Sequence, residues 1–325
     1  MKDNAQQIKR FKEVVWSYYK TSARANLPWR KKINPYRIWV SEVMLQQTQV
    51  DRVIVFFDTW MKSFPTVKNL ANASQIDILK QWKGLGYNSR ALRMKQAAQT
   101  IIDSYKGIFP KNYEELQKLP GIGPYTAGAI CAFANNQVVP IIETNIRRVF
   151  IHHFFDTVCH PELDSGSRAK SNTWIPDSAD DSTESPLGSP LGDQVRNDNS
   201  QIHDSEILEL VEQTLDQKNP REWYWALMDY GSFLGRTLNI KGKKYNPNVQ
   251  SKHYTKQSKF EGSDREIRSN ILRLLLENNN SISKIKLLKL IKQFSVDEKR
   301  IEKIMSQMNK EGYFEISRKN LQLKK

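Results

Sequence analysis

Cysteine is scarce in this sequence of 325 residues, which contains only Cys131 and Cys159. Two thiolates are too few for a four-iron cluster, which needs four of them, so that class of metal centre is excluded. Cys131 lies in an apolar stretch and is expected to be a small core residue. Long hydrophobic runs are also absent, which argues against a membrane-spanning helix. The polar start of the chain is not a secretory signal, so we expect a cytoplasmic protein.

The chain has fewer acidic than basic residues. The chain has 50 Lys and Arg residues against 35 Asp and Glu residues, which gives a formal charge of +15. The excess is concentrated in residues 241–325, which hold 21 basic and 9 acidic residues. Such a charge predicts a polyanionic partner. The alternative is a solvated basic tail that keeps the chain dissolved by repulsion.

One stretch of the sequence is typical of a tight connection between two helices. Residues 119–130 read Leu-Pro-Gly-Ile-Gly-Pro-Tyr-Thr-Ala-Gly-Ala-Ile and follow a helical pattern over 112–119. Gly121 and Gly123 can adopt positive φ without steric cost, and Pro124 suits the first turn of a helix. We predict a helix, a Gly-x-Gly hairpin and a second helix, whose exposed backbone N–H groups suit a phosphate. A plain turn without a ligand is the alternative.

Four further motifs accompany this hairpin. They are Leu27-Pro-Trp29, Ser41-Glu-Val-Met-Leu-Gln-Gln-Thr-Gln-Val50, Gly84-Leu-Gly-Tyr87 and Glu143-Thr-Asn-Ile-Arg-Arg148. In this order and spacing, the motifs resemble the adenine DNA glycosylase branch of the helix-hairpin-helix (HhH-GPD), or endonuclease III, superfamily. The resemblance covers residues 16–155 and resumes over 221–231. It implies a mainly α protein with the helix-hairpin-helix DNA glycosylase fold.

The resemblance also implies an activity. The favoured interpretation is a monofunctional base-excision-repair enzyme that hydrolyses the N-glycosidic bond of adenine mispaired with guanine or 8-oxoguanine, after flipping the base. Double-stranded DNA is then the partner, and we expect a monomer at the nucleoid in the bacterial cytoplasm. Two alternatives stay open: a glycosylase for thymine or uracil opposite guanine, and a non-catalytic protein that binds damaged DNA.

Two carboxyl groups are the candidate catalysts. Glycosidic cleavage builds positive charge on the sugar, so it calls for one acid that protonates the leaving base and one carboxylate that stabilises the sugar. Glu42 lies among apolar residues, where a buried, unpaired carboxyl would favour its protonated form. By the resemblance, Glu143 is the second carboxyl, where most relatives carry aspartate, and Asn145 helps to hold it. Tyr125 lies where bifunctional relatives carry a Schiff-base lysine, so we expect no strong lyase activity.

The resemblance also indicates residues that contact DNA. Gln47 and Tyr87 match the positions that wedge into the duplex and touch the opposite base; their alternatives are a surface amide and an aromatic ring at the edge of the core. The other candidate DNA-binding residues are Gln46 and Thr48, beside Gln47, and Gly121, Gly123, Arg147 and Arg148, which we expect at backbone phosphates.

The sequence departs from the family in its cysteines. Relatives usually carry four of them in a loop soon after the stretch that matches residues 226–231, and here that stretch continues without cysteine. The chain therefore resembles a clusterless branch of the family. We expect no [4Fe–4S] cluster and no other cofactor, and allow only a monovalent cation at the hairpin.

The composition divides the chain into parts. Residues 1–156 and 206–242 are expected to form the glycosylase domain. Residues 157–205 are rich in Ser, Asp, Pro and Gly, with 9 acidic against 3 basic residues, which predicts a disordered acidic insertion without a function of its own. Residues 243–261 are expected to be a basic linker that leads to a C-terminal unit over 262–325.

The C-terminal unit has its own pattern. Residues 267–276, 285–294 and 298–308 read as amphipathic helices, and 312–323 read as a short β-hairpin. Three helices and a basic hairpin predict a winged-helix-like unit that binds a duplex, and a plain three-helix bundle is the alternative. Neither is the C-terminal domain by which adenine glycosylases usually check for 8-oxoguanine, so the opposite-base specificity is open.

Overall fold

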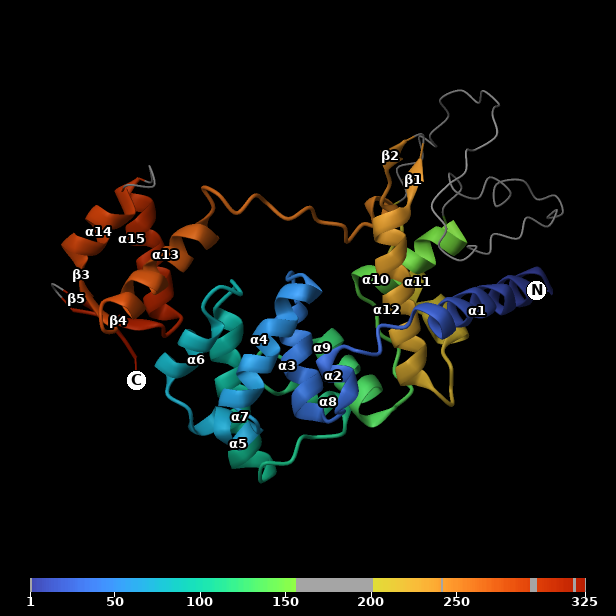
Figure 1. Ribbon diagram of the computed structural model, residues 1–325, viewed down its shortest axis with the longest axis horizontal. Helices are drawn as coiled ribbons and strands as arrows, with labels where there is room; N and C mark the ends of the chain where they lie inside the picture. The colour runs from blue at the N-terminus through green and yellow to red at the C-terminus, as the bar shows by residue number, and fades with distance from the viewer. Residues whose placement is uncertain (1, 156–200, 241, 293–296, 318–319, 325) are drawn as a thin grey trace. The chain divides into compact units, whose positions relative to one another are not determined.

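The computed structural model describes residues 2–155, 201–240, 242–292, 297–317 and 320–324, and these are mainly helical (Figure 1). The expected mainly α fold is thereby confirmed. The chain forms two compact units: unit 1 comprises Met1–Arg24 and Pro140–Thr255, and unit 2 comprises Ala25–Val139 and Lys256–Lys325. None of the helices in the described ranges is both long enough and apolar enough to cross a bilayer.

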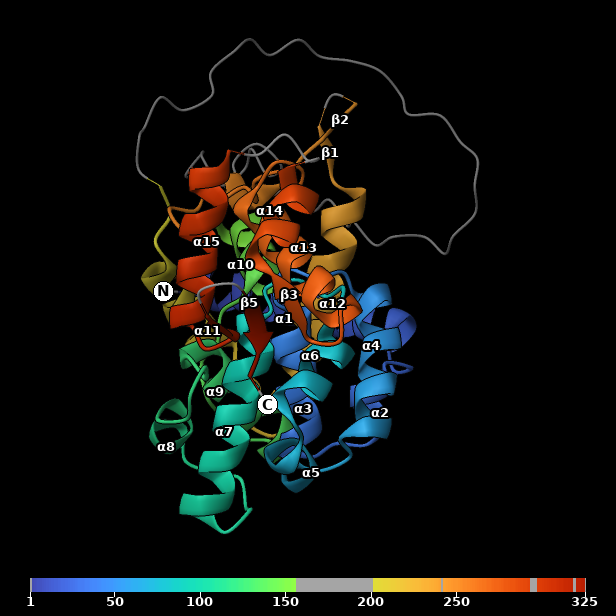
Figure 2. The same ribbon diagram turned by 90° about the vertical axis from the view of Figure 1, so that its left-hand side faces the viewer.

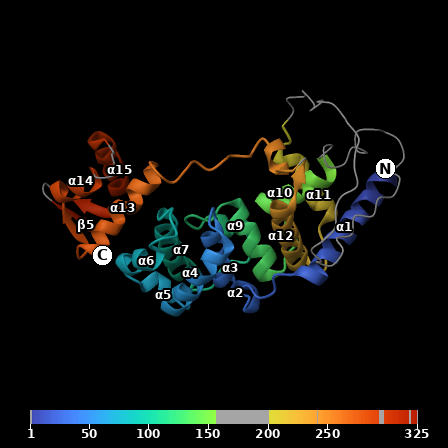
Figure 3. The ribbon, with the colours of Figure 1, turned by 45° about the horizontal axis from the view of Figure 1, so that its top comes forward.

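Unit 1 is built around three helices. Its elements are α1 (Lys2–Ser22), α10 (Thr144–Phe150) with a π-helical turn (Ile151–Phe155), α11 (Asp204–Thr214), α12 (Pro220–Thr237), β1 (Asn239–Ile240), β2 (Lys243–Lys244) and a 3-10 helix (Pro247–Gln250). Helices α1 and α10 both pack on α12, and α10 lies beside α12 in Figure 1 and Figure 3. The ring of Phe11 lies 5.1 Å from that of Phe150 and 6.0 Å from that of Trp223 at the centre of this packing.

A buried ion pair fixes the end of α1 against α12. Asp229 of α12 is only 1% exposed. Its carboxylate accepts hydrogen bonds from the backbone N of Arg24 at 2.9 Å and from the Nε of Arg24 at 2.7 Å. A buried carboxylate without such a partner would destabilise the fold strongly. The pair therefore holds the chain in place where it leaves α1.

Unit 2 contains the remaining helices of the expected glycosylase domain. They are α2 (Pro28–Lys31), α3 (Pro35–Leu45), α4 (Val50–Ser63), α5 (Val67–Asn72), α6 (Gln75–Trp82), α7 (Ser89–Tyr105), α8 (Tyr113–Gln117) and α9 (Pro124–Ala129), which continues into a π-helical turn (Ile130–Ala134). Helix α3 packs against α4 and α9, and it is buried on nearly every face from Tyr36 to Met44. Trp39 of α3, Trp60 of α4 and Trp82 of α6 are fully buried. Cys131 is buried as expected.

The C-terminal part of unit 2 combines three helices with a sheet. Its elements are α13 (Asp264–Glu277), β3 (Ser281–Ser283), α14 (Lys284–Lys292), α15 (Glu298–Lys310), β4 (Phe314–Ile316) and β5 (Asn320–Leu323), seen together in Figure 2. The strands pair antiparallel in the order β3-β5-β4, with Ile282 opposite Leu321. The three helices and the hairpin lie where the sequence predicted them. Strand β3 was not predicted, because three residues are too few to show an alternating pattern.

The C-terminal elements share a core with α6 and α7. Leu79 and Leu92 belong to the same buried cluster as the apolar residues of α13, α14 and α15. The Nε2 of Gln75 donates to the carbonyl groups of Gly312 and Tyr313, at 3.0 Å each. The sequence analysis treated residues 262–325 as a separate unit, whereas these contacts join them to residues 25–139 in one compact unit.

Two expected boundaries differ from those of the structure. Residues 243–255, expected to be part of a linker, contain β2 and the 3-10 helix, and Asn248 Nδ2 donates to the Thr144 carbonyl at 3.0 Å. The insertion predicted at 157–205 lies outside the described residues up to position 200. In its last residues, Ile202 forms a parallel bridge with Ser251, and α11 begins at Asp204.

Candidate active site

Glu42 lies on the central helix of unit 2. That helix begins as predicted: the side chain of Asn34 accepts a hydrogen bond from the backbone N of Arg37, and Pro35 occupies the first turn. Glu42 is only 4% exposed. Its burial agrees with the expectation from the apolar residues around it, and the carboxyl has a hydrogen-bond partner that was not predicted. The hydroxyl of Tyr125 donates to Glu42 Oε2 at 2.6 Å, which fixes the orientation of the carboxyl beside the start of α9.

The hairpin before α9 has the predicted form. Asn112 caps α8 by accepting hydrogen bonds from two backbone N–H groups. Gly121 has a φ of +78°, and a Cβ there would lie 2.8 Å from the Cβ of Arg93, so only glycine fits. Gly123 has a φ of −87° and therefore does not use the freedom that the sequence analysis invoked. A Cβ on Gly123 would meet nothing within 4 Å, so this turn is open to an approaching ligand. Phosphate binding at the hairpin stays a prediction.

Glu143 lies in unit 1 and caps the N-terminus of α10. Its Oε1 accepts from the backbone N of Asn145 at 2.7 Å and of Ile146 at 2.9 Å, and its Oε2 accepts from Asn145 Nδ2 at 3.3 Å. Asn145 thus holds this carboxylate in the way the resemblance implied. Burial raises the pKa of the Glu143 carboxyl, while the two backbone hydrogen bonds and the charges of Arg148 and Arg147 act in the opposite direction. The hydrogen bonds therefore fix the orientation of the carboxylate.

The two arginines of α10 are engaged inside unit 1. Arg147 forms a bidentate pair with Asp204, at 2.8 and 2.7 Å. Arg148 Nη1 donates to Asn145 Oδ1 and to the Gly231 carbonyl, each at 2.8 Å. The sequence analysis expected both side chains at DNA phosphates. A guanidinium has five N–H donors, so these contacts do not use them all, and the contact of both side chains with phosphates stays a prediction. Within unit 1, Arg148 positions Asn145, and Arg147 joins α10 to α11.

Gly231 explains how α12 supports this carboxylate. A Cβ built on Gly231 would lie 2.3 Å from the carbonyl oxygen of Asn145, so the two helices touch through their backbones here. The family resemblance covered Gly231, but no sequence pattern predicted that it contacts Asn145. The contact requires glycine at this position and sets the distance between α12 and the loop that carries Glu143.

Gly231→Ala is expected to destabilise the protein by about 3 kcal/mol and to displace Glu143, because the added methyl group overlaps backbone that cannot yield easily. Thermal unfolding measures the loss of stability. Gly235→Ala is the matched control on the same helix. Its methyl group would meet only the guanidinium end of Arg148, which can shift, so the stability loss should be much smaller. Equal losses for the two variants would contradict the prediction.

The two expected wedge residues share an unusual backbone conformation. Gln47 has a φ of +57° and Tyr87 a φ of +47°, the left-handed region that disfavours residues with a side chain by about 1–2 kcal/mol. Gln47 is exposed and Tyr87 is half-buried. Both accept hydrogen bonds from the Nε2 of Gln257, Gln47 Oε1 at 3.1 Å and Tyr87 Oη at 2.8 Å. The structure thus brings the two predicted residues together at one place on unit 2.

Arg90 holds the two loops that carry these residues, a role that the sequence analysis missed. Its guanidinium donates to the carbonyl groups of Val43 at 2.6 Å, Gln46 at 2.8 Å and Gly86 at 3.0 Å. Burial lowers the pKa of Arg90 to about 10. The backbone carbonyl of Gln46, a predicted DNA contact, accepts this hydrogen bond from Arg90, and the Gln46 side chain is exposed. The Thr48 hydroxyl donates to the same carbonyl at 3.4 Å, so both neighbours of Gln47 support the turn.

The predicted residues therefore fall into separate groups. Glu42 with Tyr125, and Gln47 with Tyr87, belong to unit 2, while Glu143 with Asn145 belongs to unit 1. Cys159 lies outside the described residues.

Known proteins are similar in sequence to the part of the chain that contains Glu42 and Glu143. Residues 40–163 match the HhH-GPD superfamily base excision DNA repair protein family. An adenine DNA glycosylase of Buchnera aphidicola subsp. Baizongia pistaciae is 42% identical over 144 residues, which are 44% of this chain and 41% of that protein. This chain thus matches about two-fifths of the length of that relative.

Solved structures of low sequence identity share the fold. A thermostable thymine-DNA glycosylase superposes with a TM-score of 0.53 at 21% identity, covering 70% of this chain and 88% of that one. Endonuclease III in a non-covalent DNA complex superposes with a TM-score of 0.51 at 16% identity, covering 73% and 89%. At these identities, the likeness indicates the architecture alone.

Proposed function

We propose that this chain is an HhH-GPD base excision DNA repair protein and that it removes adenine from duplex DNA. The adenine would be mispaired with guanine or 8-oxoguanine, and the reaction is hydrolysis of its N-glycosidic bond after the base has left the stack. The identity of 42% to an adenine DNA glycosylase supports this substrate. The chemistry rests on the two carboxyl groups, Glu42 and Glu143.

The observation that carries the proposal is the hydrogen bond from Tyr125 to the buried Glu42. A carboxyl in an apolar setting is a suitable general acid, and a fixed hydroxyl keeps it in one orientation. We assign to Glu42 the transfer of a proton to the leaving adenine. Tyr125 supplies no amine that could form a Schiff base, so the product is an abasic site in an intact strand.

We assign to Glu143 the stabilisation of the cationic sugar. This role needs an ionised carboxylate in a fixed position, and three hydrogen bonds from Asn145 and Ile146 orient the group. Glutamate is one methylene longer than the aspartate of most relatives, which moves the carboxylate by about 1 Å, enough to lower the rate about a hundredfold if uncorrected. We propose that the loop before α10 compensates for the extra length.

The basic C-terminal region supports DNA as the partner. We propose that its lysines contact backbone phosphates without reading sequence, together with the hairpin at Gly121 and Gly123. A monovalent cation at that hairpin, a monomeric state and a place at the nucleoid in the bacterial cytoplasm belong to the same proposal.

An excision assay on a panel of mismatched duplexes tests the function. The full chain should release adenine opposite guanine or 8-oxoguanine, and the strand should break only on heating with alkali. Borohydride should trap no covalent adduct in good yield. Release of thymine or uracil opposite guanine instead of adenine would establish the other enzyme activity. Binding to the mismatches without release of any base would mean that the protein is not an enzyme.

We expect the purified protein to contain no iron–sulfur cluster. Four thiolates are needed for [4Fe–4S], and the sequence contains two cysteines. We expect a colourless protein with no visible absorbance from sulfur-to-iron charge transfer. Iron analysis after anaerobic purification provides the check, and a content of about four iron atoms per chain would contradict the prediction.

A further inference from the structure

Two side chains from the C-terminal part of unit 2 converge on the expected wedge residues. Gln257 Nε2 donates to Gln47 Oε1 at 3.1 Å and to Tyr87 Oη at 2.8 Å. Arg265 Nη1 donates to the same Tyr87 oxygen at 2.7 Å, and its Cζ lies 5.2 Å from the centre of the Tyr87 ring. Residues 170 or more positions apart in sequence therefore form one hydrogen-bonded group, with two side-chain donors on a single hydroxyl.

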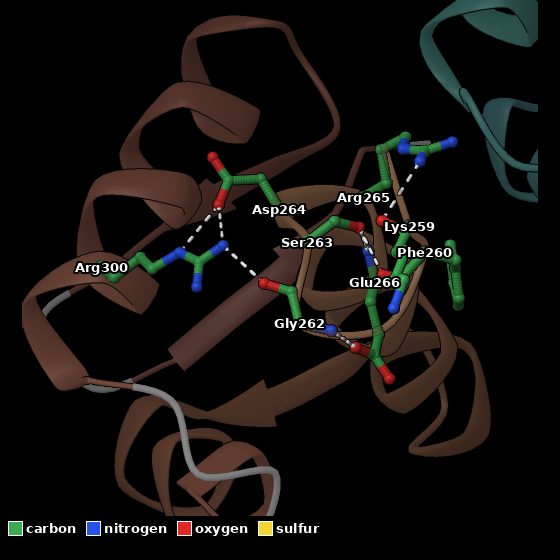
Figure 4. A network of polar contacts seen from close by, with 8 residues as sticks. All are labelled: Lys259, Phe260, Gly262, Ser263, Asp264, Arg265, Glu266 and Arg300. Carbon is green, nitrogen blue, oxygen red and sulfur yellow. Dashed lines mark hydrogen bonds and ion pairs between the residues drawn. The ribbon is translucent and has the colours of Figure 1, made fainter. Parts of the chain in front are cut away.

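Arg265 is held rigidly where α13 begins. Its Nη2 donates to the Ser258 carbonyl at 2.6 Å. The surrounding turn is fixed by further contacts: Ser263 caps the helix, Gly262 N donates to Glu266 Oε2 at 2.7 Å, and Arg300 pairs with Asp264 (Figure 4). Figure 4 shows Arg265 pointing away from the Arg300–Asp264 pair. A guanidinium fixed in this way loses little further freedom when it binds a ligand.

The chemistry of this group matches a purine edge. A guanidinium carries five N–H donors, and a glutamine side chain offers both donors and an acceptor. Guanine presents its O6 and N7 acceptors side by side, a pattern that arginine binds with two hydrogen bonds and that cytosine lacks. Because Gln257 and Arg265 contact Gln47 and Tyr87 directly, they also lie close to any base that those two residues contact.

We propose that Gln257 and Arg265 determine specificity by contacting the base opposite the excised adenine, and that they select guanine over pyrimidines. The inference rests on the proposed function, because it takes Gln47 and Tyr87 to lie at the opposite base.

Single-turnover excision of adenine opposite guanine, 8-oxoguanine or cytosine tests the proposal in the full chain. Arg265→Ala and Gln257→Ala should each lower the guanine-to-cytosine rate ratio about tenfold, with the melting temperature near that of wild type. Arg265→Lys keeps the charge but loses the planar fork, so the ratio should fall while affinity for undamaged duplex is retained. Lys303→Ala, which removes an exposed charge on α15, is the matched control and should leave the ratio unchanged.

Three outcomes would overturn the proposal. An unchanged ratio in correctly folded variants would show that neither residue reads the opposite base. Faster excision or tighter binding on every duplex would mean that the two side chains cover Tyr87 and must be displaced. An equal loss on every duplex would show that they only position Tyr87.

A failure of the proposed function would be seen separately, in the wild-type protein. If wild type releases no adenine from any duplex, the guanine-to-cytosine preference is measured by binding instead. Duplexes with guanine or cytosine opposite an abasic analogue then compete for the protein. A guanine preference that Arg265→Ala removes would still support the contact, and its absence from wild type would overturn it.

Discussion

Glu143→Gln is expected to lower the rate of base excision by about 10³-fold or more, with affinity for the mismatched duplex near that of wild type. The glutamine keeps an oxygen that can accept from the backbone N–H groups of Asn145 and Ile146, so the loop before α10 keeps its shape. What the variant loses is the negative charge that stabilises the cationic sugar. Single-turnover excision and equilibrium binding, measured on the same duplex, separate the two effects.

Glu143→Asp serves as the matched control, because it keeps the charge but shortens the side chain. If the loop has adapted to glutamate, this variant should also be slow, by about a hundredfold, since the carboxylate is held too far back. Excision by Glu143→Gln at the wild-type rate would show that Glu143 is not the sugar-stabilising group. Faster excision by Glu143→Asp than by wild type would mean that the loop has not compensated for the extra methylene.

The raised pKa of Glu143 also predicts a pH dependence. Catalysis needs the ionised form, so excision should decline as the pH falls, and the decline should begin above the ordinary glutamate pKa of 4.5. The effect on stability has the opposite sign. A carboxyl whose pKa is raised by folding stabilises the protein below its unfolded pKa, and this contribution is lost as the pH rises through the folded pKa. Wild type should therefore lose stability relative to Glu143→Gln as the pH rises over that range, which thermal unfolding would detect.

Local sequence signals predicted the elements that carry the site. Asn34 and Pro35 start the helix of Glu42, and the hairpin forms around Gly121, because caps and tight turns depend on neighbouring residues. The residues that contact them could not be predicted from the sequence. Tyr125 meets Glu42 across 83 positions, and Arg148 meets Gly231 across another 83. Such contacts arise from the packing of helices, which no local pattern specifies.

The same distinction explains the arginines. A basic residue next to a catalytic motif suggests a phosphate contact, and the sequence analysis assigned Arg147 and Arg148 to that role. Which acceptors inside the fold lie beside an arginine could not be predicted, and Asp204 lies beside Arg147. Arg90 had no predicted role, yet its guanidinium donates to the carbonyl groups of Val43, Gln46 and Gly86.

Glu42→Gln is expected to lower the excision rate by about 10²–10⁴-fold, because the amide cannot donate a proton to the leaving adenine. Tyr125→Phe should have a smaller effect, about tenfold, because it removes the 2.6 Å hydrogen bond that orients the carboxyl and leaves the acid itself in place. Single-turnover rates on an adenine–guanine duplex measure both losses.

The pair Glu42 and Tyr125 should act as one unit, which a double variant can establish. Once Glu42 is glutamine, the tyrosine hydroxyl has no acid left to orient, so Tyr125→Phe should add little to the loss already caused by Glu42→Gln. Tyr113→Phe is the matched control, since it removes a hydroxyl from the neighbouring helix α8 and should leave the rate unchanged. Losses that multiply fully in the double variant would mean that Tyr125 contributes to excision through another contact than the one it makes with Glu42.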